Sequence, residues 1–416
     1  MSNILQLKRV IKEKCTVSYE YRVEGKWLKY FNLNESFFIT YPFDISDVPD
    51  SILTVPFVCN FLPAIWLCDA KAVIPSIDKD FYEQIDNIKK GYMDMYPMLE
   101  FKGVLEVKEV LTNNESEDGG SALLFSGGVD AYTSLIRHIN EKPLLATLWG
   151  PDVDIDNEAG WSKVKKGIME TADDFDLEFI PIKTAMKKVI NEPCLTGLVS
   201  ASKDDWYHGF QHGIAIISHM APVAYKKGLS KVYIASSFPA YAKGTYTCAS
   251  DPTIDNYMKY CGCSTIHDGY ELDRQQKIHY IVEEKNKHNY KVRLHVCWES
   301  DGGENCCHCE KCYRTVIGIV AEGENPLNYG FNWSGKNIKV MKKDFKTKLV
   351  IPENRINTRY IIPQTIMKEN IHKLTNAKDY KWFMEMDFSR FNRYFLKLLY
   401  NSKVARKIRN VTSKIK

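Results

Sequence analysis

Short apolar runs alternate with longer amphipathic stretches through the middle of the chain. The apolar runs have the length of buried strands, and the stretches between them have the spacing of helices. This order of strand and helix favours a parallel sheet. The strand candidates are 121–125, 143–149, 177–181 and 231–236, and the helix candidates are 130–140, 160–174 and 207–227.

The first 115 residues show a different pattern. Alternating, β-like positions occupy Thr16–Tyr21 and Trp27–Phe31, and a helical stretch follows around Phe81–Tyr96 after proline-punctuated sequence. The polar segment 112–120 is typical of a linker or exposed loop. We therefore expect a separate mixed α+β domain over residues 1–115 and a central domain over residues 116–335.

Residues 336–416 are expected to form a mostly helical, basic extension. Residues 388–399 space apolar side chains at three and four positions, as in an amphipathic helix. Residues 388–416 hold nine Lys or Arg and no acid, so the net charge of +4 leaves 4 − 9 = −5 for the rest of the chain. The body therefore has no basic signature of a nucleic-acid binder, and only this helix leaves such contact open.

No stretch reaches the run of about 20 apolar residues that spans a bilayer. The most apolar segment, Val55–Cys68, is short and is interrupted by two prolines and Asn60. We see no signal-peptide pattern, and seven of the cysteines show no framework spacing. These features predict a soluble cytoplasmic protein with reduced thiols.

A phosphate-binding turn is predicted at residues 126–130. The apolar run 123–125 ends a buried strand, and Gly127 and Gly128 permit a tight turn with exposed amides. The following helix would direct its N-terminal N–H groups at an anion. The turn lacks the Gly-Lys-Ser/Thr of a Walker A loop and the Gly-x-Gly-x-x-Gly of dinucleotide folds.

This turn resembles the PP-loop of the ATP pyrophosphatase superfamily. Ser126, Gly127, Gly128 and Asp130 match its Ser-Gly-Gly-x-Asp-Ser motif, whereas Ala131 replaces the second serine and removes one hydroxyl contact. The resemblance implies that the backbone from Ser126 through Val129 to Asp130 holds the pyrophosphate of ATP. It also implies that Asp130 helps to hold Mg²⁺.

A cysteine-rich segment at residues 297–312 predicts a zinc site. Cys297, Cys306, Cys309 and Cys312 follow the spacing C-x8-C-x2-C-x2-C, which can close four thiolates around zinc. A closed set of four sulfurs has no open position for water, so we expect a structural Zn²⁺. The neighbours Cys307 and His308 are alternative ligands, and free or disulfide-bonded cysteines are the alternative to a metal site.

Together the two motifs resemble one branch of that superfamily, the 7-cyano-7-deazaguanine synthases of queuosine biosynthesis and their divergent relatives. The resemblance covers about residues 120–320, and the run at 305–315 is most similar to relatives from antiphage operons and surface-polysaccharide clusters. It implies a Rossmann-like α/β domain that activates a carboxylate, such as a 7-carboxy-7-deazaguanine-like acid, as an acyl-AMP. Ammonia or an amine, which an operon-encoded partner protein can carry, would then displace AMP.

In parallel sheets the ligand lies beyond the carboxyl ends of the strands. Trp149 and Gly150 follow the second strand candidate, where related enzymes hold the nucleoside, although an ordinary turn is equally expected. Ser236 and Ser237 follow the fourth strand candidate. We assign Ser236 to the nucleotide and Ser237 to the substrate.

A further polar cluster covers residues 267–278. Arg274 and Lys277 lie at i and i+3, on one face of a helix, and their cations would neutralise the phosphates during catalysis. His267 and Asp268 would position the acceptor or relay a proton. The alternative is a solvated helix start capped by Asp273.

Three assignments stay open. His208 and His212 lie at i and i+4 without a nearby glutamate, so we expect packing or substrate contact rather than a metal pair. A sulfurtransferase that carries a persulfide on Cys261, Cys263 or Cys307 is the alternative enzyme. A degenerate ATP sensor or scaffold is the non-enzymatic alternative, and the sequence also leaves open whether the chain forms a homodimer.

Overall fold

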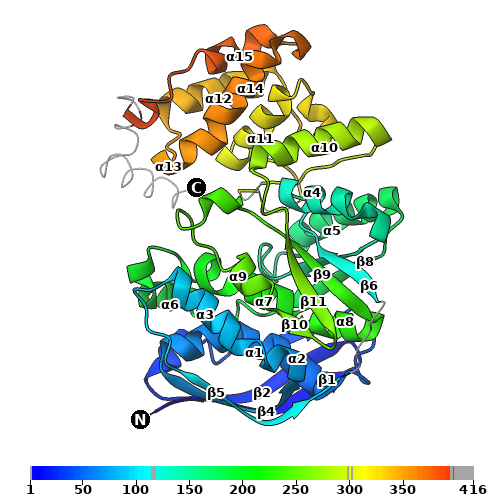
Figure 1. The fold of residues 1–416 in the computed structure, drawn as a ribbon, viewed down its shortest axis with the longest axis vertical. Helices are drawn as coiled ribbons and strands as arrows, with labels where there is room; N and C mark the ends of the chain where they lie inside the picture. Colours follow the sequence, from blue (N-terminus) through cyan, green and yellow to red (C-terminus); the bar gives the residue numbers. More distant parts are fainter. Residues whose placement is uncertain (1, 114–118, 298, 301–302, 394–396, 398–416) are drawn as a thin grey trace. The chain divides into compact units, whose positions relative to one another are not determined.

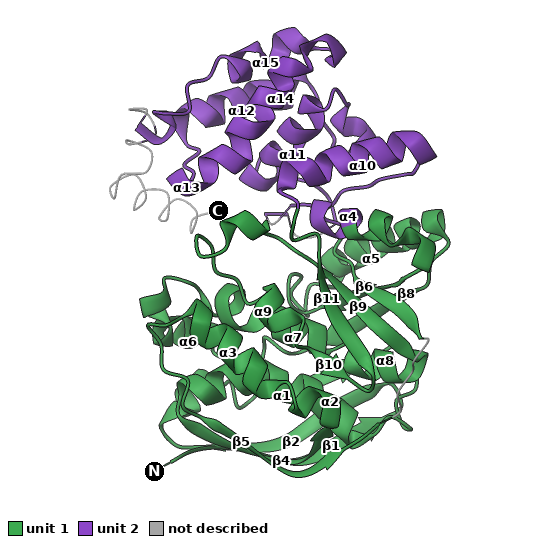
Figure 2. Ribbon diagram, viewed as in Figure 1, with its two compact units in different colours: residues 1–126, 134–271 green, residues 127–133, 272–416 purple. Residues whose placement is uncertain are grey.

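A computed structural model describes residues 2–113, 119–297, 299–300, 303–393 and 397. The chain divides into two compact units (Figures 1 and 2). Unit 1 consists of residues 1–126 and 134–271, and unit 2 consists of residues 127–133 and 272–416. This division differs from the expected boundaries near residues 115 and 335.

Unit 1 is built on one 11-stranded sheet, in which parallel pairs outnumber antiparallel ones. The protein is thus an α/β protein with a large, mostly parallel sheet, as the alternation of strand and helix predicts. In sheet order the strands are β10 (Lys259–Tyr260), β11 (Cys263–Asp268), β9 (Leu229–Ala235), β6 (Gly120–Leu124), β7 (Leu144–Trp149), β8 (Phe179–Thr184), β3 (Phe38–Thr40), β2 (Thr16–Glu24), β1 (Asn3–Glu13), β4 (Ala70–Asp78) and β5 (Val104–Leu111).

The four predicted strands, together with β11, which was not predicted, form the central, parallel part of this sheet. β8, β7, β6, β9 and β11 lie side by side in that order, each parallel to its neighbour. The chain starts at β6, adds β7 and β8 on one side, and then adds β9 and β11 on the other. The winding direction therefore reverses between β6 and β9, the place where open α/β sheets bind ligands beyond their strand ends.

The N-terminal strands do not form a sheet of their own. β3 pairs antiparallel with β8, with Ile39 opposite Thr184, and thereby joins β1–β5 to the central strands. A single hydrophobic core also includes residues from both regions, such as Leu5, Phe57 and Val232. Residues 1–113 therefore belong to the same compact unit as the central sheet instead of a separate domain.

Helix α1 (Asp50–Leu67) is the central core helix of unit 1. It contains Pro56 and Pro63 and is buried over residues 51–66. Its buried Asn60 donates to Met186 O at 3.1 Å and accepts from Gln211 Nε2 at 2.7 Å, so its polar atoms are satisfied. By length and composition α1 resembles a membrane span, but 89% of the apolar window is buried inside the protein, as in the core helix of a soluble protein.

Three helical or strand predictions differ from the structure. Residues 26–30 form a 3₁₀ helix, η1 (Lys26–Tyr30), instead of a strand, because Trp27 and Tyr30 are both buried on one side of the turn. The stretch near 81–96 consists of α2 (Lys79–Tyr82) and α3 (Ile85–Met95). The stretch 207–227 is broken into a π-helical turn η4 (Tyr207–Gln211), α7 (His212–Ser218) and α8 (Ala221–Lys227).

The described part of unit 2 is helical and contains no strand. The expected extension from residue 336 is mostly helical where it is described. In the predicted amphipathic helix, residues 388–393 form only the short 3₁₀ helix η9 (Phe391–Arg393), and residues 394–396 and 398–399 lie outside the described residues. The main helices are α10 (Arg274–His288), α11 (Glu310–Ala321), α12 (Gly335–Thr347), α13 (Glu353–Ile356), the π-helical turn η7 (Asn357–Ile361), α14 (Ile362–Glu369) and α15 (Ala377–Met384).

Candidate functional site

The predicted phosphate-binding turn lies where β6 ends and α4 (Val129–Arg137) begins. Gly127 has φ of 74°, a conformation that favours glycine, and its carbonyl accepts from His295 N at 2.8 Å. The Gly128 carbonyl accepts from Tyr132 N at 2.9 Å and so begins the helix. The first turn of α4 thus has the geometry in which exposed helix amides bind anions.

Asp130, on this first turn, pairs with two cations from the start of α10. Its carboxylate lies 3.1 Å from an Arg274 guanidinium nitrogen and 3.1 Å from Lys277 Nζ. Burial alone would raise the pKa of Asp130, but Lys277 and Arg274 outweigh it and lower that pKa. The structure therefore brings together three of the predicted site residues within unit 2.

The predicted helix cap is present as well. Asp273 accepts hydrogen bonds from the backbone N–H groups of Gln275 and Gln276 at 2.9 Å, and Gln276 returns a bond to Asp273 N. This capping box fixes the start of α10. The sequence offered the cap and the cation pair as alternatives, but both are present. The Asp273 cap fixes where α10 begins, and from that start Arg274 and Lys277 reach Asp130.

Three further cations lie near this pair. Lys311 and Arg314 come from α11, and Arg359 comes from η7. Lys311 lowers the pKa of Asp130, and Arg314 and Arg359 act with burial to lower the pKa of Arg274, which falls to about 10. Sequence reasoning missed all three, because only tertiary packing brings α11 and η7 beside α10.

The group carries excess positive charge in a poorly solvated place. Glu310 is the second carboxylate, and it pairs with Arg359 at 3.1 Å and Arg314 at 3.5 Å. The side chains of Arg274, Arg314 and Arg359 are each less than one-fifth exposed. Five cations and two carboxylates give a net charge of 5 − 2 = +3. We call this group the basic cluster; its members are Asp130, Arg274, Lys277, Glu310, Lys311, Arg314 and Arg359.

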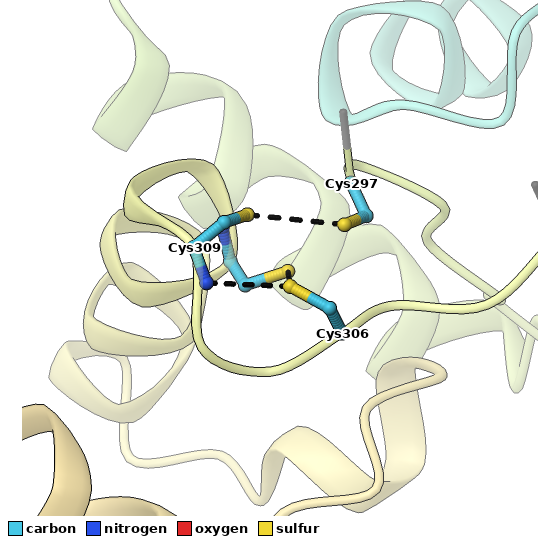
Figure 3. Close-up of side chains that lie close together, drawn as sticks. Cys297, Cys306 and Cys309 are labelled. Carbon is cyan, nitrogen blue, oxygen red and sulfur yellow. Dashed lines mark hydrogen bonds between the residues drawn. The ribbon is translucent and has the colours of Figure 1, made fainter. Parts of the chain in front are cut away.

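The four predicted cysteine ligands converge in unit 2. Figure 3 labels three of them, Cys297, Cys306 and Cys309. Their sulfurs lie within 4.8 Å of one another, with 3.9 Å between Cys297 and Cys309 and between Cys306 and Cys312. Four thiolates about 2.3 Å from a tetrahedral zinc ion would be separated by about 3.8 Å. The group could therefore hold a metal ion such as zinc.

The backbone also favours charged sulfurs at this group. Cys309 caps α11, and the Cys306 sulfur accepts from Cys309 N at 3.3 Å. A hydrogen bond from the Cys312 thiol lowers the pKa of Cys309, and the same bond raises the pKa of Cys312; burial raises the pKa of Cys306. The charge is therefore concentrated on Cys309. Cys307 lies outside the set and bonds instead to Asn305 O at 3.4 Å. The four predicted cysteines thus form the candidate metal centre, whereas the alternative ligand His308 lies in a second group with Glu299 and the shared Cys306.

In unit 1 the predicted nucleoside contacts have local structural roles. The Trp149 indole donates to Asp154 O at 3.0 Å, stacks on Trp161 and lies under Lys183 Nζ at 4.2 Å. Gly150 has φ of 134°, and a Cβ there would meet Thr184 O at 2.1 Å. Trp149 and Gly150 are therefore explained by the ordinary turn that the sequence also predicted.

The polar residues that follow β9 and those at the end of β11 lie in two different environments. Ser236 is buried and donates to Phe238 O at 2.7 Å, whereas Ser237 is exposed. His267 pairs with the buried Asp255 at 2.7 Å, and both Ser236 and His267 line a small pocket.

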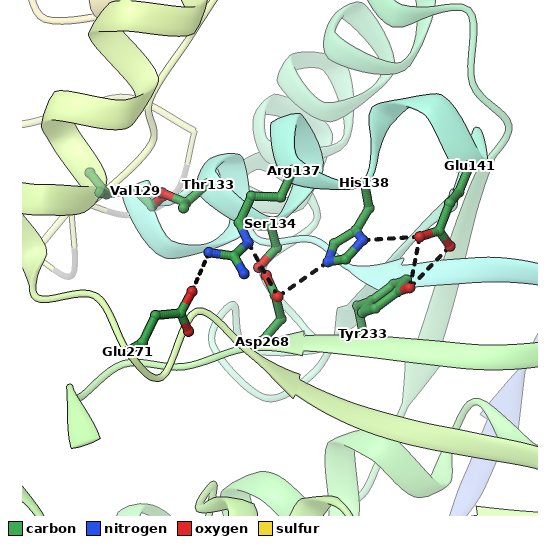
Figure 4. Close-up of polar contacts among 9 residues, drawn as sticks. All are labelled: Val129, Thr133, Ser134, Arg137, His138, Glu141, Tyr233, Asp268 and Glu271. Carbon is green, nitrogen blue, oxygen red and sulfur yellow. Dashed lines mark hydrogen bonds and ion pairs between the residues drawn. The ribbon is translucent and has the colours of Figure 1, made fainter.

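Asp268 instead holds a structural network (Figure 4). It accepts from Ser134 at 2.6 Å, contacts His138 at 3.2 Å and pairs with Arg137 at 3.4 Å. His138 also stacks on Tyr233, and a hydrogen-bonded Glu141 joins the two rings. The sequence assigns the Asp268 carboxylate to substrate positioning. In the structure it is already engaged by Ser134 and Arg137 of α4 and by His138, the residue that follows α4.

A scan against protein-family models found no match, and a search of curated proteins found no significant match.

Proposed function

We propose that this protein is an ATP-dependent adenylating enzyme of the PP-loop type. The observation that carries the proposal is the basic cluster, a net charge of +3 gathered around the first turn of α4. Excess positive charge of this kind, held in poorly solvated surroundings, stabilises the polyphosphate of ATP and the pyrophosphate that departs from it. The strand order of the central sheet is that of doubly wound nucleotide-binding folds, which agrees with this assignment.

Asp130 has a defined part in this proposal. In the structure its carboxylate is the counter-ion of Arg274 and Lys277. When Mg-ATP binds, the carboxylate would turn to Mg²⁺, and the two cations would turn to the phosphate oxygens. Because Lys277 is only 2% exposed, its charge would remain compensated throughout by one anion or the other.

The proposed reaction follows from the resemblance. A substrate carboxylate attacks the α-phosphate of ATP, pyrophosphate leaves, and an acyl-AMP results. Ammonia or an amine, free or on a partner protein, then displaces AMP. A 7-carboxy-7-deazaguanine-like acid is the proposed substrate. The cysteine group would hold a structural Zn²⁺ in the same unit, and no step requires that ion.

The cysteines do not favour the sulfurtransferase alternative. Burial raises the pKa of Cys263 to about 12, and it also raises the pKa of Cys261 and Cys307. A persulfide carrier reacts as a thiolate, so these three thiols are poor candidates.

The nucleotide products test the proposal. Purified protein is incubated with Mg-ATP, ammonium and 7-carboxy-7-deazaguanine, and AMP, ADP, phosphate and pyrophosphate are measured. We expect AMP and pyrophosphate in equal amounts, dependent on the acid and reduced about 100-fold or more in Asp130→Asn. ADP and phosphate as products would overturn the proposal. Tight ATP binding without any AMP would favour the sensor alternative, to which the buried Ala131 points.

A charge-matched pair of variants tests the basic cluster. Arg359→Gln removes one cation from the cluster, whereas Lys339→Gln removes an exposed cation from α12. We expect Arg359→Gln to weaken ATP binding at least tenfold and Lys339→Gln to leave it unchanged, as measured by isothermal titration. Equal effects of the two substitutions would show that general charge, and not the cluster, binds ATP.

A further inference from the structure

A second cluster of reactive side chains lies in unit 1, and no part of the proposed ATP chemistry uses it. Cys248 lies in the segment before α9 (Pro252–Asp255), and the imidazoles of His208 and His212 lie close enough to its sulfur to lower the pKa of the thiol. The Ala249 amide donates to His208 O at 2.8 Å and fixes this segment against η4. The Ser250 amide also approaches the Cys248 sulfur, at 3.4 Å.

A carboxylate orients one of the imidazoles. Asp204 Oδ1 lies 3.2 Å from His208 Nδ1, and the other Asp204 oxygen accepts from Tyr96 and Thr247. Cys248, His208 and Asp204 are therefore neighbours in that order, with a hydrogen bond between the histidine and the aspartate. This order, with a nucleophile, a base and a group that orients the base, defines sites of nucleophilic catalysis.

The local backbone holds these groups in unusual geometry. His208 lies on the π-helical turn η4, and such turns are rare and occur frequently at functional sites. The next turn begins at His212, so His208 and His212 both face Cys248. Gly213 permits the close approach, because a Cβ there would meet Ala249 O at 2.3 Å and Asp255 Oδ1 at 2.7 Å. His212 Nδ1 has no hydrogen-bond partner among the described residues.

A narrow pocket gives access to the sulfur. It is lined by Cys248 together with Ser236, Phe238, Tyr246, Ser250 and His267. Phe238 and Tyr246 stack on each other with ring centroids 5.1 Å apart, and the His267 ring is held by Asp255. The space between these side chains is about the size of one water molecule, and Lys243 and Asp251 also line it. It excludes a large ligand, and a short acyl group would enter only by displacing side chains of the lining.

We propose that Cys248 is the nucleophile of a second site, which transfers short acyl groups with His208 as its base and Asp204 as the residue that positions His208. In this reaction the Cys248 sulfur attacks the acyl carbonyl carbon. A carbon–sulfur bond forms, the bond from that carbon to the leaving oxygen breaks, and the leaving oxygen takes the proton of the His208 imidazolium. An amine or water, deprotonated by His208, then releases the acyl group and restores the thiolate.

The electrostatics agree with this assignment. Burial would raise the pKa of Cys248, but the hydrogen bonds and charges of His208 and His212 bring it down to about 6. The bond to Asp204 is the main reason that the pKa of His208 rises to about 10. Thiolate and imidazolium therefore coexist at neutral pH. The titratable groups that face Cys248 are His208, His212, Tyr92, Tyr96 and Tyr207.

Alkylation measured against pH is the first test. Folded protein is treated briefly with iodoacetamide between pH 5 and 9, and the modification of each cysteine is quantified by peptide mass spectrometry. We expect the rate at Cys248 to rise with a midpoint near pH 6 and to be lost in Cys248→Ser. His208→Gln should raise the midpoint by about one unit or more, because it removes the imidazolium. The buried Cys263 serves as the reference thiol and should stay unmodified at pH 7.

Acyl transfer is the second test. With p-nitrophenyl acetate we expect a stoichiometric burst of p-nitrophenolate and an acetyl adduct on Cys248. The burst should be absent in Cys248→Ser and slowed at least tenfold in His208→Gln, and it should persist in Asp130→Asn. The proposal is overturned by an unmodified Cys248 at pH 7, by a midpoint that His208→Gln does not move, or by a burst that survives in Cys248→Ser. Because none of these results involves ATP, failure here is distinct from failure of the adenylation proposal.

Discussion

At the scale of single residues, the two candidate sites differ in how far they could be predicted. Some site residues lie in short sequence motifs whose spacing is typical of a known kind of site, so they could be predicted from the sequence. They are Asp130, Arg274 and the four clustered cysteines. Arg359 and Cys248 stand in no motif. Their partners, Glu310 and His208, lie far away in the chain, and only the tertiary packing of helices and loops brings them together.

His219 provides a residue-scale prediction about pH. It is fully buried and bonds to Ala215 O at 2.6 Å and Thr184 Oγ1 at 2.8 Å. Burial lowers its pKa to about 4, so the unfolded chain binds a proton at mildly acidic pH that the folded protein does not. The contribution of His219 to stability is therefore complete above about pH 6.5 and is lost as the pH falls toward 4.

We expect this group alone to lower the free energy of unfolding by about 2 kcal/mol between pH 7 and pH 5. Urea denaturation of the wild type and of His219→Gln at both pH values measures the effect. The variant should lose less stability on acidification than the wild type, and His279→Gln, at an exposed position on α10, should behave like the wild type. Parallel losses in all three proteins would contradict the assignment.

At the scale of elements, the alternation of apolar runs and amphipathic stretches located the central strands within a few residues. It failed where burial is not periodic. Helix α1 is buried on nearly all sides, so it has no amphipathic pattern by which it could be predicted. The 3₁₀ helix η1 was taken for a strand because two buried aromatic residues in a short segment satisfy either pattern.

Two glycines provide a matched test of packing between elements. Gly103 precedes β5, and a Cβ there would lie 1.9 Å from the carbonyl oxygen of Ile65 in α1. Gly167 lies inside α5 (Glu158–Phe175), with nothing within 4 Å of its added Cβ. We expect Gly103→Ala to cost about 3 kcal/mol or more, because backbone must shift, and Gly167→Ala to stabilise by about 0.5–1 kcal/mol. Opposite shifts in melting temperature would confirm the packing; equal shifts would contradict it.

At the scale of the whole molecule, the parallel α/β class could be predicted, but the division of the chain could not. The expected boundary near residue 115 rests on a polar linker, yet β3 joins both regions into one sheet. Local composition does not report such pairing, because backbone hydrogen bonds between segments far apart in the chain form it. The boundary between the units at residues 126 and 127 could not be predicted either, because it divides the phosphate-binding turn, which is one continuous motif in the sequence.

The cysteine group provides a prediction at this scale, because it belongs entirely to unit 2. Metal analysis of fresh protein should find about one zinc per chain, and Cys312→Ser should lose it while Cys307→Ser keeps it. Structural zinc contributes on the order of 10 kcal/mol to small domains. Calorimetry should therefore show that a chelator lowers the unfolding temperature of unit 2 more than that of unit 1. Full zinc content in Cys312→Ser would refute the ligand assignment.

The discontinuous course of unit 2 has a consequence for how the protein is made. Residues 127–133 leave the ribosome long before residue 272, with the whole of residues 134–271 between them. The helices of unit 2 can therefore complete their fold only by packing against residues 127–133, which were synthesised much earlier. A separately expressed fragment 272–416 would lack Asp130 and leave Arg274 and Lys277 without their carboxylate. The gene therefore cannot be cut between the two units without dividing one of them.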